Sequence, residues 1–447
     1  MSLPPVFAAS ALYDNLLQTA LRQFFSRATF ETEPIPSLSS DGRLAIEPTR
    51  DPSVLSIRWF GMRHIVHVPG RRPFTAHEVR LARAIGTVLA TRYRAIFDPK
   101  QMLERGDLFR GAIEDRYVGT FLDSVGYGDP SQTRADLIAT AIEVLRVAAL
   151  SSYENRAISS GVLMLGAEEA PGRPEPPAGQ AYRYSQALTG IKSFYRISNG
   201  LDTLFLVNRS GYVLDIVEVS QYAAGGELNV PCPAQYQPHA RATAGNQAIC
   251  VVLSPTHEIK VFAEGVQTFS FRNARWHLLD VQAKYEMWAD AVGNVALAKR
   301  LFQTALDLSD QREGALFVVL RNPGESLAQL VAPGDQLDRI RSATADAPTR
   351  GQLLHMLRGR SATDLDPAVL AGLARTDGAT VMDSSGRLLA VGAILLHTEA
   401  PEPHSSLAVE GARTTAAMAA GRFGAVLKVS EDGLITFYDQ QERIWEI

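Results

Sequence analysis

Two similar segments, whose matching residues lie 175 positions apart, constrain the fold of this 447-residue chain more than any other feature. Residues 197–219 and 374–396 each read as an apolar strand, a polar turn with glycine and a second apolar strand, which predicts a β-hairpin. Asp202 falls on Asp377, and Gly211 falls on Gly386. A self-similar pattern at a fixed offset indicates that one structural unit occurs twice.

A second pair of segments extends this repeat. The string Ala-Arg-x-Thr-Ala occurs at 240–244 and at 412–416, which are 172 positions apart. Each string is predicted to open a helix of small residues, followed by two strands. In each copy the first strand ends in serine and the second in phenylalanine: Ser254 with Phe262, and Ser430 with Phe437. Any α/β protein shares such periodicity, but shared identities in the same order favour a tandem repeat.

The length and the helix and strand patterns set the domain organisation. A chain of this size is too long for one hydrophobic core. Predicted helices at 134–157 and 281–310 each lead into a strand that begins with glycine, at 161–166 and 314–320. The segment 168–180 holds four prolines and is predicted as a linker.

We therefore expect an α/β protein with mixed sheets flanked by helices. Its predicted parts are an N-terminal α+β region over residues 1–130, a first and more degenerate repeat unit over 131–280, and a second unit over 281–447.

The N-terminal region shows secondary structure but no motif with a chemical function. Helices are predicted at 11–28 and 74–97, and one or two strands at 53–68. Thr75 and Glu78 have the spacing of a capping box at the start of the second helix. His64, His67 and His77 lack the spacing of metal ligands on one element, so we expect no metal site here.

The composition excludes several functional classes. The formal net charge is -4, from 44 Lys and Arg against 48 Asp and Glu, so no overall positive field attracts nucleic acid or an anionic membrane. No apolar stretch is long enough to span a membrane, and the first residues do not resemble a signal peptide, so we expect a cytoplasmic protein. Cys232 and Cys250 are predicted to be reduced and structural.

Residues 411–415 have the features of a phosphate site. Gly411 leads directly into a predicted helix, whose first N–H groups and positive dipole end attract anions. Arg413 and the hydroxyl groups of Thr414 and Thr415 add hydrogen-bond donors. Asp377 stands beside the small residues Gly378 and Ala379, and its carboxylate is a candidate ligand for a metal ion or a ribose hydroxyl group.

These motifs give the C-terminal part of the chain a resemblance to the diadenylate cyclase (DAC, or DisA-N) family. The matching residues are Asp377-Gly378-Ala379, Gly411-Ala412-Arg413 and the segment from Val429 to Ile435, which contains Ser430 and Glu431. The resemblance covers residues 314–447 well and 159–270 weakly. It implies a nucleotide site formed by these motifs, with Mg²⁺ or Mn²⁺ as the metal.

The chain also departs from the family pattern. Thr414 and Thr415 stand where the family has histidine and a second arginine. These losses remove a bidentate phosphate contact, which phosphoryl transfer needs for positioning and charge neutralisation. In the first copy Thr203 and Leu204 replace Gly-Ala, and these bulkier residues would crowd a nucleotide. The pattern is similar to DAC-like probable sensor domains of the DACNV type, which implies a role in bacterial nucleotide signalling or anti-phage defence.

Three functions follow from this resemblance. The first is a nucleotide sensor that recognises ATP or a cyclic dinucleotide and forms a homodimer through its DAC-like units. The second is an active diadenylate cyclase that joins two ATP molecules, with Asp377 and Arg413 as catalytic residues. The third is an interaction scaffold that keeps only the fold. Structural alternatives also stand for the residues: Asp377 as a turn cap, Arg413 in a surface ion pair, and Ser430 with Glu431 as ordinary turn residues.

Overall fold

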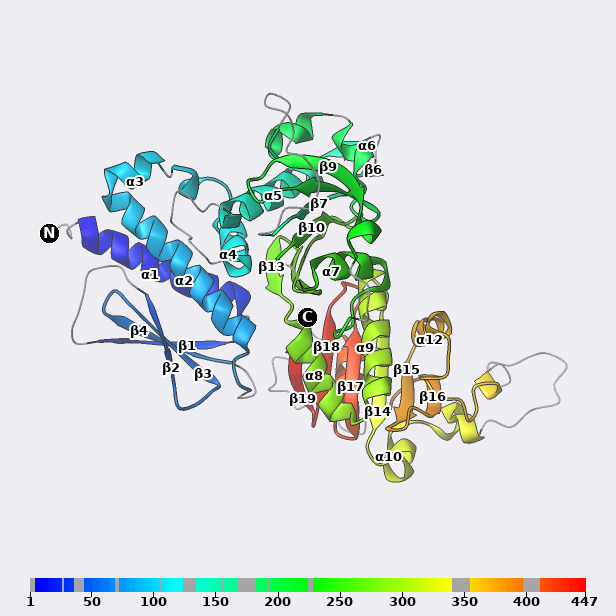
Figure 1. Ribbon diagram of the computed structural model, residues 1–447. Helices are drawn as coiled ribbons and strands as arrows, with labels where there is room; N and C mark the ends of the chain where they lie inside the picture. The colour runs from blue at the N-terminus through cyan, green and yellow to red at the C-terminus, as the bar shows by residue number, and fades with distance from the viewer. Residues whose placement is uncertain are drawn as a thin grey trace. The chain divides into compact units, whose positions relative to one another are not determined.

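The computed structural model of the chain describes residues 5–25, 28–35, 44–68, 72–104, 106–123, 134–153, 156–166, 182–191, 193–223, 228–245, 247–339, 354–396 and 411–447. The predicted linker at 168–180 lies outside these residues. The fold is mixed α/β, as predicted (Figure 1). The chain forms two compact units: unit 1 holds residues 1–228 and 235–280, and unit 2 holds residues 229–234 and 281–447. The division into three domains stays a prediction.

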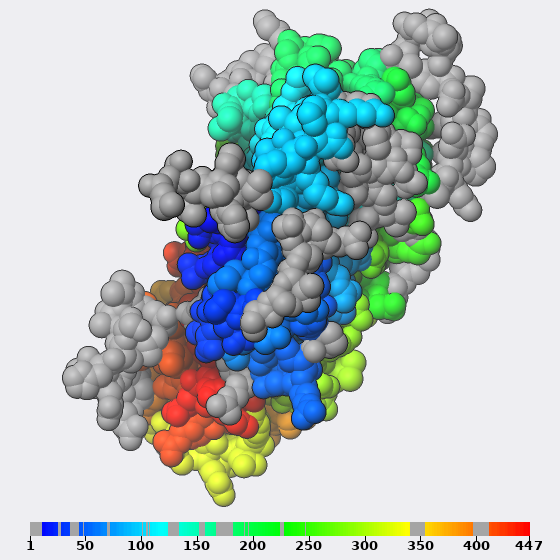
Figure 2. Space-filling model, turned by 90° about the vertical axis from the view of Figure 1, so that its left-hand side faces the viewer, coloured from blue at the N-terminus to red at the C-terminus, as the bar shows by residue number. Residues whose placement is uncertain are grey.

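Unit 1 begins with an α+β region. Its elements are α1 (Pro5–Phe24), β1 (Thr29–Pro34), β2 (Ala45–Pro48), β3 (Val54–Trp59), β4 (Met62–His67), α2 (Ala76–Phe97), α3 (Pro99–Glu104) and α4 (Ile113–Leu122). The strands form an antiparallel sheet in the order β1-β4-β3-β2. Alternate residues of β3 (Leu55, Ile57 and Trp59) are buried in one cluster with α1 and α2, as a sheet covered on one face requires. The region forms the blue and cyan surface in Figure 2.

The rest of unit 1 is built on a seven-stranded sheet in the order β13-β12-β11-β10-β7-β8-β9. Its strands are β7 (Ser160–Met164), β8 (Thr203–Val207), β9 (Val213–Glu218), β10 (Ile249–Leu253), β11 (Ile259–Ala263), β12 (Val266–Arg272) and β13 (Arg275–Leu278). The helices are α5 (Arg134–Ala149), α6 (Phe194–Ile197) and α7 (Gln237–Thr243), and the short strands β5 (Ser152–Tyr153) and β6 (Arg156–Ala157) form a separate hairpin. One hydrophobic cluster includes residues of this sheet and of the α+β region, so unit 1 has a continuous core.

Unit 2 is built on a six-stranded sheet in the order β16-β15-β14-β17-β18-β19. Its strands are β14 (Ala315–Leu320), β15 (Ala379–Asp383), β16 (Leu388–Ala393), β17 (Gly424–Val429), β18 (Ile435–Asp439) and β19 (Glu442–Glu446). Its helices are α8 (Val281–Val292), α9 (Val295–Asp310), α10 (Pro323–Leu330), α12 (Pro367–Ala374) and α13 (Ala412–Gly421). The predicted helix at 281–310 is therefore two helices. Gly293 has φ +70° and breaks it, and the Asn294 side chain caps α9 by accepting from the Leu297 N–H.

The two large sheets share one topology, which supports the predicted repeat. The order β9-β8-β7-β10-β11-β12 in unit 1 corresponds to β16-β15-β14-β17-β18-β19 in unit 2. Each sheet has one parallel pair of strands, β7 with β8 and β14 with β15. The pairs on both sides of it are antiparallel. The register agrees as well: Val162 pairs with Phe205 and Val251, and Phe317 pairs with Thr380 and Leu427.

Both predicted hairpins of the repeat are present, and their turns use the same chemistry. Asn208 accepts from the N–H of Tyr212 through its side chain, and Asp383 accepts from the N–H of Arg387 in the same way. Gly211 and Gly386 occupy the same turn position, with φ +84° and +91°. Because non-glycine residues rarely adopt this conformation, the 175-residue offset reflects one conserved turn geometry.

The predicted alignment of the Ala-Arg-x-Thr-Ala strings is wrong. The paired strands β10 and β17 fix the offset at 176, from Val251 to Leu427. The string at 412–416 opens α13, whereas Arg241 lies in the last turn of α7, which ends at Thr243. Counting back from the strands, His239 falls on Thr415. Phe262 likewise falls on Tyr438 rather than on Phe437.

Candidate functional site

Three segments of unit 2 converge at one edge of its sheet. β14 is parallel to β15 and antiparallel to β17, so the starts of β14 and β15 lie at the same edge as the end of β17. The start of α13 lies there too, because Thr414 and Arg413 contact Lys428 and Glu431. We call this place the α13 edge and define it by Gly314, Asp377, Gly411–Thr415, Lys428 and Glu431.

Arg413 extends across the start of β14. A Cβ atom at Gly314 would collide with its guanidinium group, so the absence of a side chain at Gly314 makes room for the arginine. The Nη1 atom lies 3.4 Å from Oε1 of Glu431; the Arg413 side chain is partly exposed and that of Glu431 is exposed. Such exposed pairs contribute little to stability. A phosphate group could therefore replace Glu431 as the partner of Arg413.

The first turn of α13 offers donors to an anion. Gly411 is the N-cap, and no side chain caps the helix. The first intrahelical hydrogen bond of α13 runs from the N–H of Thr414 to the Gly411 carbonyl oxygen, at 2.8 Å. The N–H groups of Ala412 and Arg413 come before it and have no acceptor within the helix. Thr415 is half-buried in the next position.

Lys428 is a component of this edge that the sequence analysis did not identify. Its Nζ atom donates to Oγ1 of the buried Thr414 at 2.7 Å, so Thr414 positions the ammonium group beside the first turn of α13. The signal in the sequence was a single charged residue within the apolar run of β17. Two cations, Arg413 and Lys428, therefore stand at one helix N-terminus, where positive charge is unfavourable without a nearby anion, and Glu431 supplies one carboxylate there, to Arg413.

Residues 377–379 lie at the same edge, at the start of β15. Asp377 is exposed, about 10 Å from the end of β17 because one strand lies between them. Gly378 has φ +107°, and a Cβ atom there would lie 2.5 Å from the carbonyl carbon of Gly392. Ala379 is fully buried in the core of unit 2. Of the three, only Asp377 presents a side chain to a ligand.

Ser430 and Glu431 belong to the hairpin turn between β17 and β18. The Gly433 N–H bonds to the Ser430 carbonyl oxygen at 2.9 Å, and Gly433 has φ +83°. The turn from Ser254 to His257 in unit 1 has the same bonds and a positive φ at His257. Because both copies form this turn, Ser430 acts as an ordinary turn residue. Glu431 lies in the same turn and contacts Arg413.

A metal ion at this edge would depend mainly on the ligand. Within the described parts of the chain, no group of three or more His, Cys, Asp or Glu side chains could hold a metal ion. Mg²⁺ in nucleotide sites commonly takes one or two carboxylates and completes its shell with phosphate oxygens and water. Asp377 would supply one carboxylate, and the nucleotide and water would supply the other oxygens.

The corresponding edge of unit 1, which we call the α7 edge (Ser160, Ser198–Thr203, His239 and Ser254), is closed. Gly200 has φ +75° and lies against the strand ends, because a Cβ atom there would be 2.7 Å from the Ser160 carbonyl oxygen. The Asn199 side chain accepts from the N–H groups of Leu201, Asp202 and Thr203, at 2.9, 2.8 and 3.1 Å.

His239 completes this closure. Its Nε2 atom is 2.8 Å from the Gly200 carbonyl oxygen, and the ring is fully buried. Burial lowers the pKa of His239 to about 4, so the ring is neutral near pH 7. The backbone turn and this ring fill the place where the α13 edge of unit 2 is exposed.

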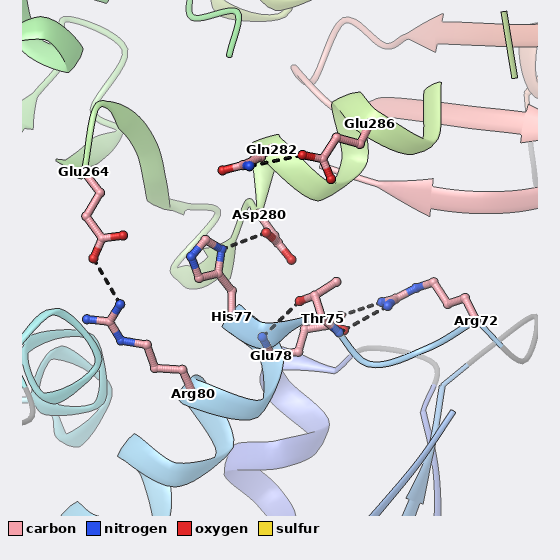
Figure 3. Close-up of polar contacts among 9 residues, drawn as sticks. All are labelled: Arg72, Thr75, His77, Glu78, Arg80, Glu264, Asp280, Gln282 and Glu286. Carbon is pink, nitrogen blue, oxygen red and sulfur yellow. Dashed lines mark hydrogen bonds and ion pairs between the residues drawn. The ribbon is translucent and has the colours of Figure 1, made fainter. Parts of the chain in front are cut away.

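A polar cluster at the start of α2 is the most developed alternative site in unit 1 (Figure 3). Thr75 and Glu78 form the predicted capping box, which is confirmed. Arg72 bonds to Glu78, Arg80 to Glu264, and His77 to Asp280 at 2.8 Å. The bond to Asp280 raises the pKa of His77. These groups satisfy one another and join α2 to the seven-stranded sheet, which is a structural role. His64 is likewise paired, with Asp14.

Comparison with known proteins adds little to this site. No family model matches the chain, and no curated protein matches it. One matching solved structure is a hypothetical membrane spanning protein from Bacillus cereus, at 22% identity and a TM-score of 0.24, covering 34% of this chain and 62% of that one. Another is a double mutant of DacA from Staphylococcus aureus, at 19% identity and a TM-score of 0.20, covering 33% and 83%. At these scores the similarity is weak and carries no argument. Within the described residues, no helix is long and apolar enough to cross a membrane.

Proposed function

We propose that unit 2 binds a nucleotide by its phosphate groups at the α13 edge, and that the protein acts as a nucleotide sensor. The observation that carries the proposal is the convergence of Arg413 and Lys428 on the uncapped start of α13. Helix N–H groups with two cations are complementary to a phosphate group in both charge and hydrogen bonding. ATP and a cyclic dinucleotide share this chemistry, and the resemblance to the diadenylate cyclase family favours an adenine nucleotide.

Sensing fits the α13 edge better than catalysis. The edge has one arginine at the motif 413–415, followed by two threonines, and its two carboxylates are Asp377 and Glu431, of which Glu431 is paired with Arg413. Phosphoryl transfer requires several groups that neutralise charge and align the reactants. Recognition requires only that the bound state be favoured. A Mg²⁺ or Mn²⁺ ion at Asp377 would accompany ATP as part of the ligand.

Calorimetry and thermal unfolding test the proposal with ATP and cyclic di-AMP, each with and without Mg²⁺. A ligand at a hundred times its Kd adds about 2.7 kcal/mol of stability, which corresponds to a rise in Tm of roughly 5 to 10 °C for a unit of this size. The Arg413→Gln variant should bind about 10- to 100-fold more weakly, because it loses a charge-assisted hydrogen bond.

Arg241→Gln is the matched control. It changes the arginine of the other Ala-Arg-x-Thr-Ala string, which lies at the end of α7 rather than at the start of a helix. We expect its nucleotide affinity to equal that of the wild type. If neither nucleotide binds, or if Arg413→Gln binds as well as Arg241→Gln, the proposal is wrong. Formation of cyclic di-AMP from ATP and Mn²⁺, lost in Asp377→Ala, would show a cyclase instead of a sensor.

A further inference from the structure

We infer that the N-terminal region of unit 1 binds an amphiphilic anion, an aliphatic chain with a carboxylate head group, in a groove between α2 and β2. The groove has a volume of about 440 Å³ and is lined by Leu44, Ile46, Arg83, Gly86, Thr87, Ala90 and Arg94. This volume is within the range of sites for small organic molecules.

The shape of the groove follows from small residues on one face of α2. Gly86, Thr87 and Ala90 form its helical side, and the Leu44 side chain lies directly against Gly86, where a Cβ atom would be 2.6 Å from Leu44 Cδ2. Ile46 continues the apolar wall along the edge strand β2. The Thr87 hydroxyl group donates to the Arg83 carbonyl oxygen at 2.8 Å, so it is used within the helix. The middle of the groove therefore favours an apolar ligand.

The two arginines set the charge of the ligand. Arg83 and Arg94 are exposed and lie eleven residues apart on one face of α2, which places them about 16 Å apart along the axis. Among the described residues, no acidic side chain lines the groove and neither arginine has an acidic partner. An apolar channel with a cation at each end is complementary to an aliphatic chain that ends in an anion.

This ligand class differs from that proposed for the α13 edge, where the described residues offer cations and hydrogen-bond donors. A nucleotide is polar along its length, whereas the groove places apolar contacts between its two cations. The inference thus gives the N-terminal region a ligand of its own and does not depend on nucleotide binding.

Titration of the full chain with decanoate, followed by calorimetry, tests this inference. We expect saturable binding of decanoate with one site per protein chain. Inorganic phosphate, which lacks the aliphatic chain, and decanol, which lacks the charge, should not bind. Arg83→Gln or Arg94→Gln should weaken decanoate binding about tenfold or more, whichever arginine holds the head group. Thr87→Trp fills the groove from a half-exposed helix position and should abolish binding.

Arg50→Gln is the matched control, because Arg50 is exposed in the same region but does not line the groove. It should bind decanoate like the wild type. Thermal unfolding verifies that each variant is folded. Decanoate binding that survives Thr87→Trp, or that falls equally in Arg50→Gln, would overturn the inference, as would the absence of saturable binding to the wild type.

Discussion

The α7 edge of unit 1 and the α13 edge of unit 2 occupy the same place in the same sheet topology, yet one is closed and the other is exposed. At the α7 edge, Gly200 lies against the carbonyl oxygens of Ser160 and Leu253. At the α13 edge, the corresponding residues Arg375, Thr376 and Asp377 are exposed. The loop before the second strand therefore packs on the strand ends in unit 1 and is exposed in unit 2.

The two sheets differ in which of two neighbouring core positions carries the large side chain and which the small one. In unit 1 the Leu204 side chain of β8 covers Gly161 of β7. In unit 2 the small residue is Ala379 on β15, and the large one is Leu316 on β14; both are buried in its core. A core of constant volume tolerates such swaps. The small Ala379 therefore serves packing, and its identity alone does not indicate a nucleotide site.

The largest expected effect is that of Gly200→Ala on unit 1. The substitution places a Cβ atom at φ +75° and within 2.9 Å of the Ser160 backbone, so the turn must move. We expect a loss of more than about 3 kcal/mol in urea denaturation. Gly411→Ala, with φ -60° and no atom within 4 Å of its Cβ, should cost about 1 kcal/mol or less. Equal losses would show that the two edges are equally closed.

The second-largest expected effect is a loss of stability of unit 1 at acidic pH, through His239 at the α7 edge. The pKa of His239 is lowered by burial to about 4 in the folded state, so the unfolded chain binds the proton more tightly. The stabilisation is present above the unfolded pKa near 6.5 and is lost as the pH falls toward 4, by about 3 kcal/mol in full.

Denaturation of wild type and His239→Gln between pH 7 and 4 measures this term. The variant should be less stable at pH 7, and its stability should fall less on acidification. The aligned residue of unit 2 is Thr415, which does not titrate, so unit 2 should lack this contribution. An identical slope with pH in both proteins would remove His239 from the account.

Lys428→Val is expected to have the smallest of these effects. The substitution makes the α13 edge more like the α7 edge. Val252 occupies the same register position in unit 1, opposite Gly161, as Lys428 does opposite Leu316. We expect nucleotide affinity to fall about tenfold, because one cation near the phosphate is lost. Lys299→Val, at an exposed position of α9, is the control for loss of charge alone. Equal affinities of the two variants would place Lys428 outside the site.

The sequence predicted the features that are encoded locally. Both hairpins were predicted from a polar turn with glycine between two apolar runs, and the capping box from the spacing of Thr75 and Glu78. In the hairpin turns, Asn208 and Asp383 satisfy backbone groups within a few residues of themselves. The helix break at Gly293 also has a local signal, the pair Gly293-Asn294, in which Asn294 caps α9. The apolar periodicity continues on both sides of this pair, so one long helix was predicted.

Features that depend on long-range pairing were not predictable in this way. The strings around Arg241 and Arg413 match in identity, but only the pairing of β10 and β17 shows that they differ in position on their helices. The contact of Lys428 with Thr414 and the space that Gly314 leaves for Arg413 also require the folded sheet. The closure of the α7 edge by Gly200 depends on tertiary contact in the same way.

Hydrogen exchange by mass spectrometry, with and without ATP and Mg²⁺, reports in one experiment whether a nucleotide binds at the α13 edge and leaves the α7 edge unchanged. Bound ligand protects the amide groups that it orders or contacts. We predict new protection at 411–415 and 428–431, and unchanged exchange at 198–203 and around His239. Protection at the α7 edge, or an ATP-bound protein without protection at the start of α13, would contradict this prediction.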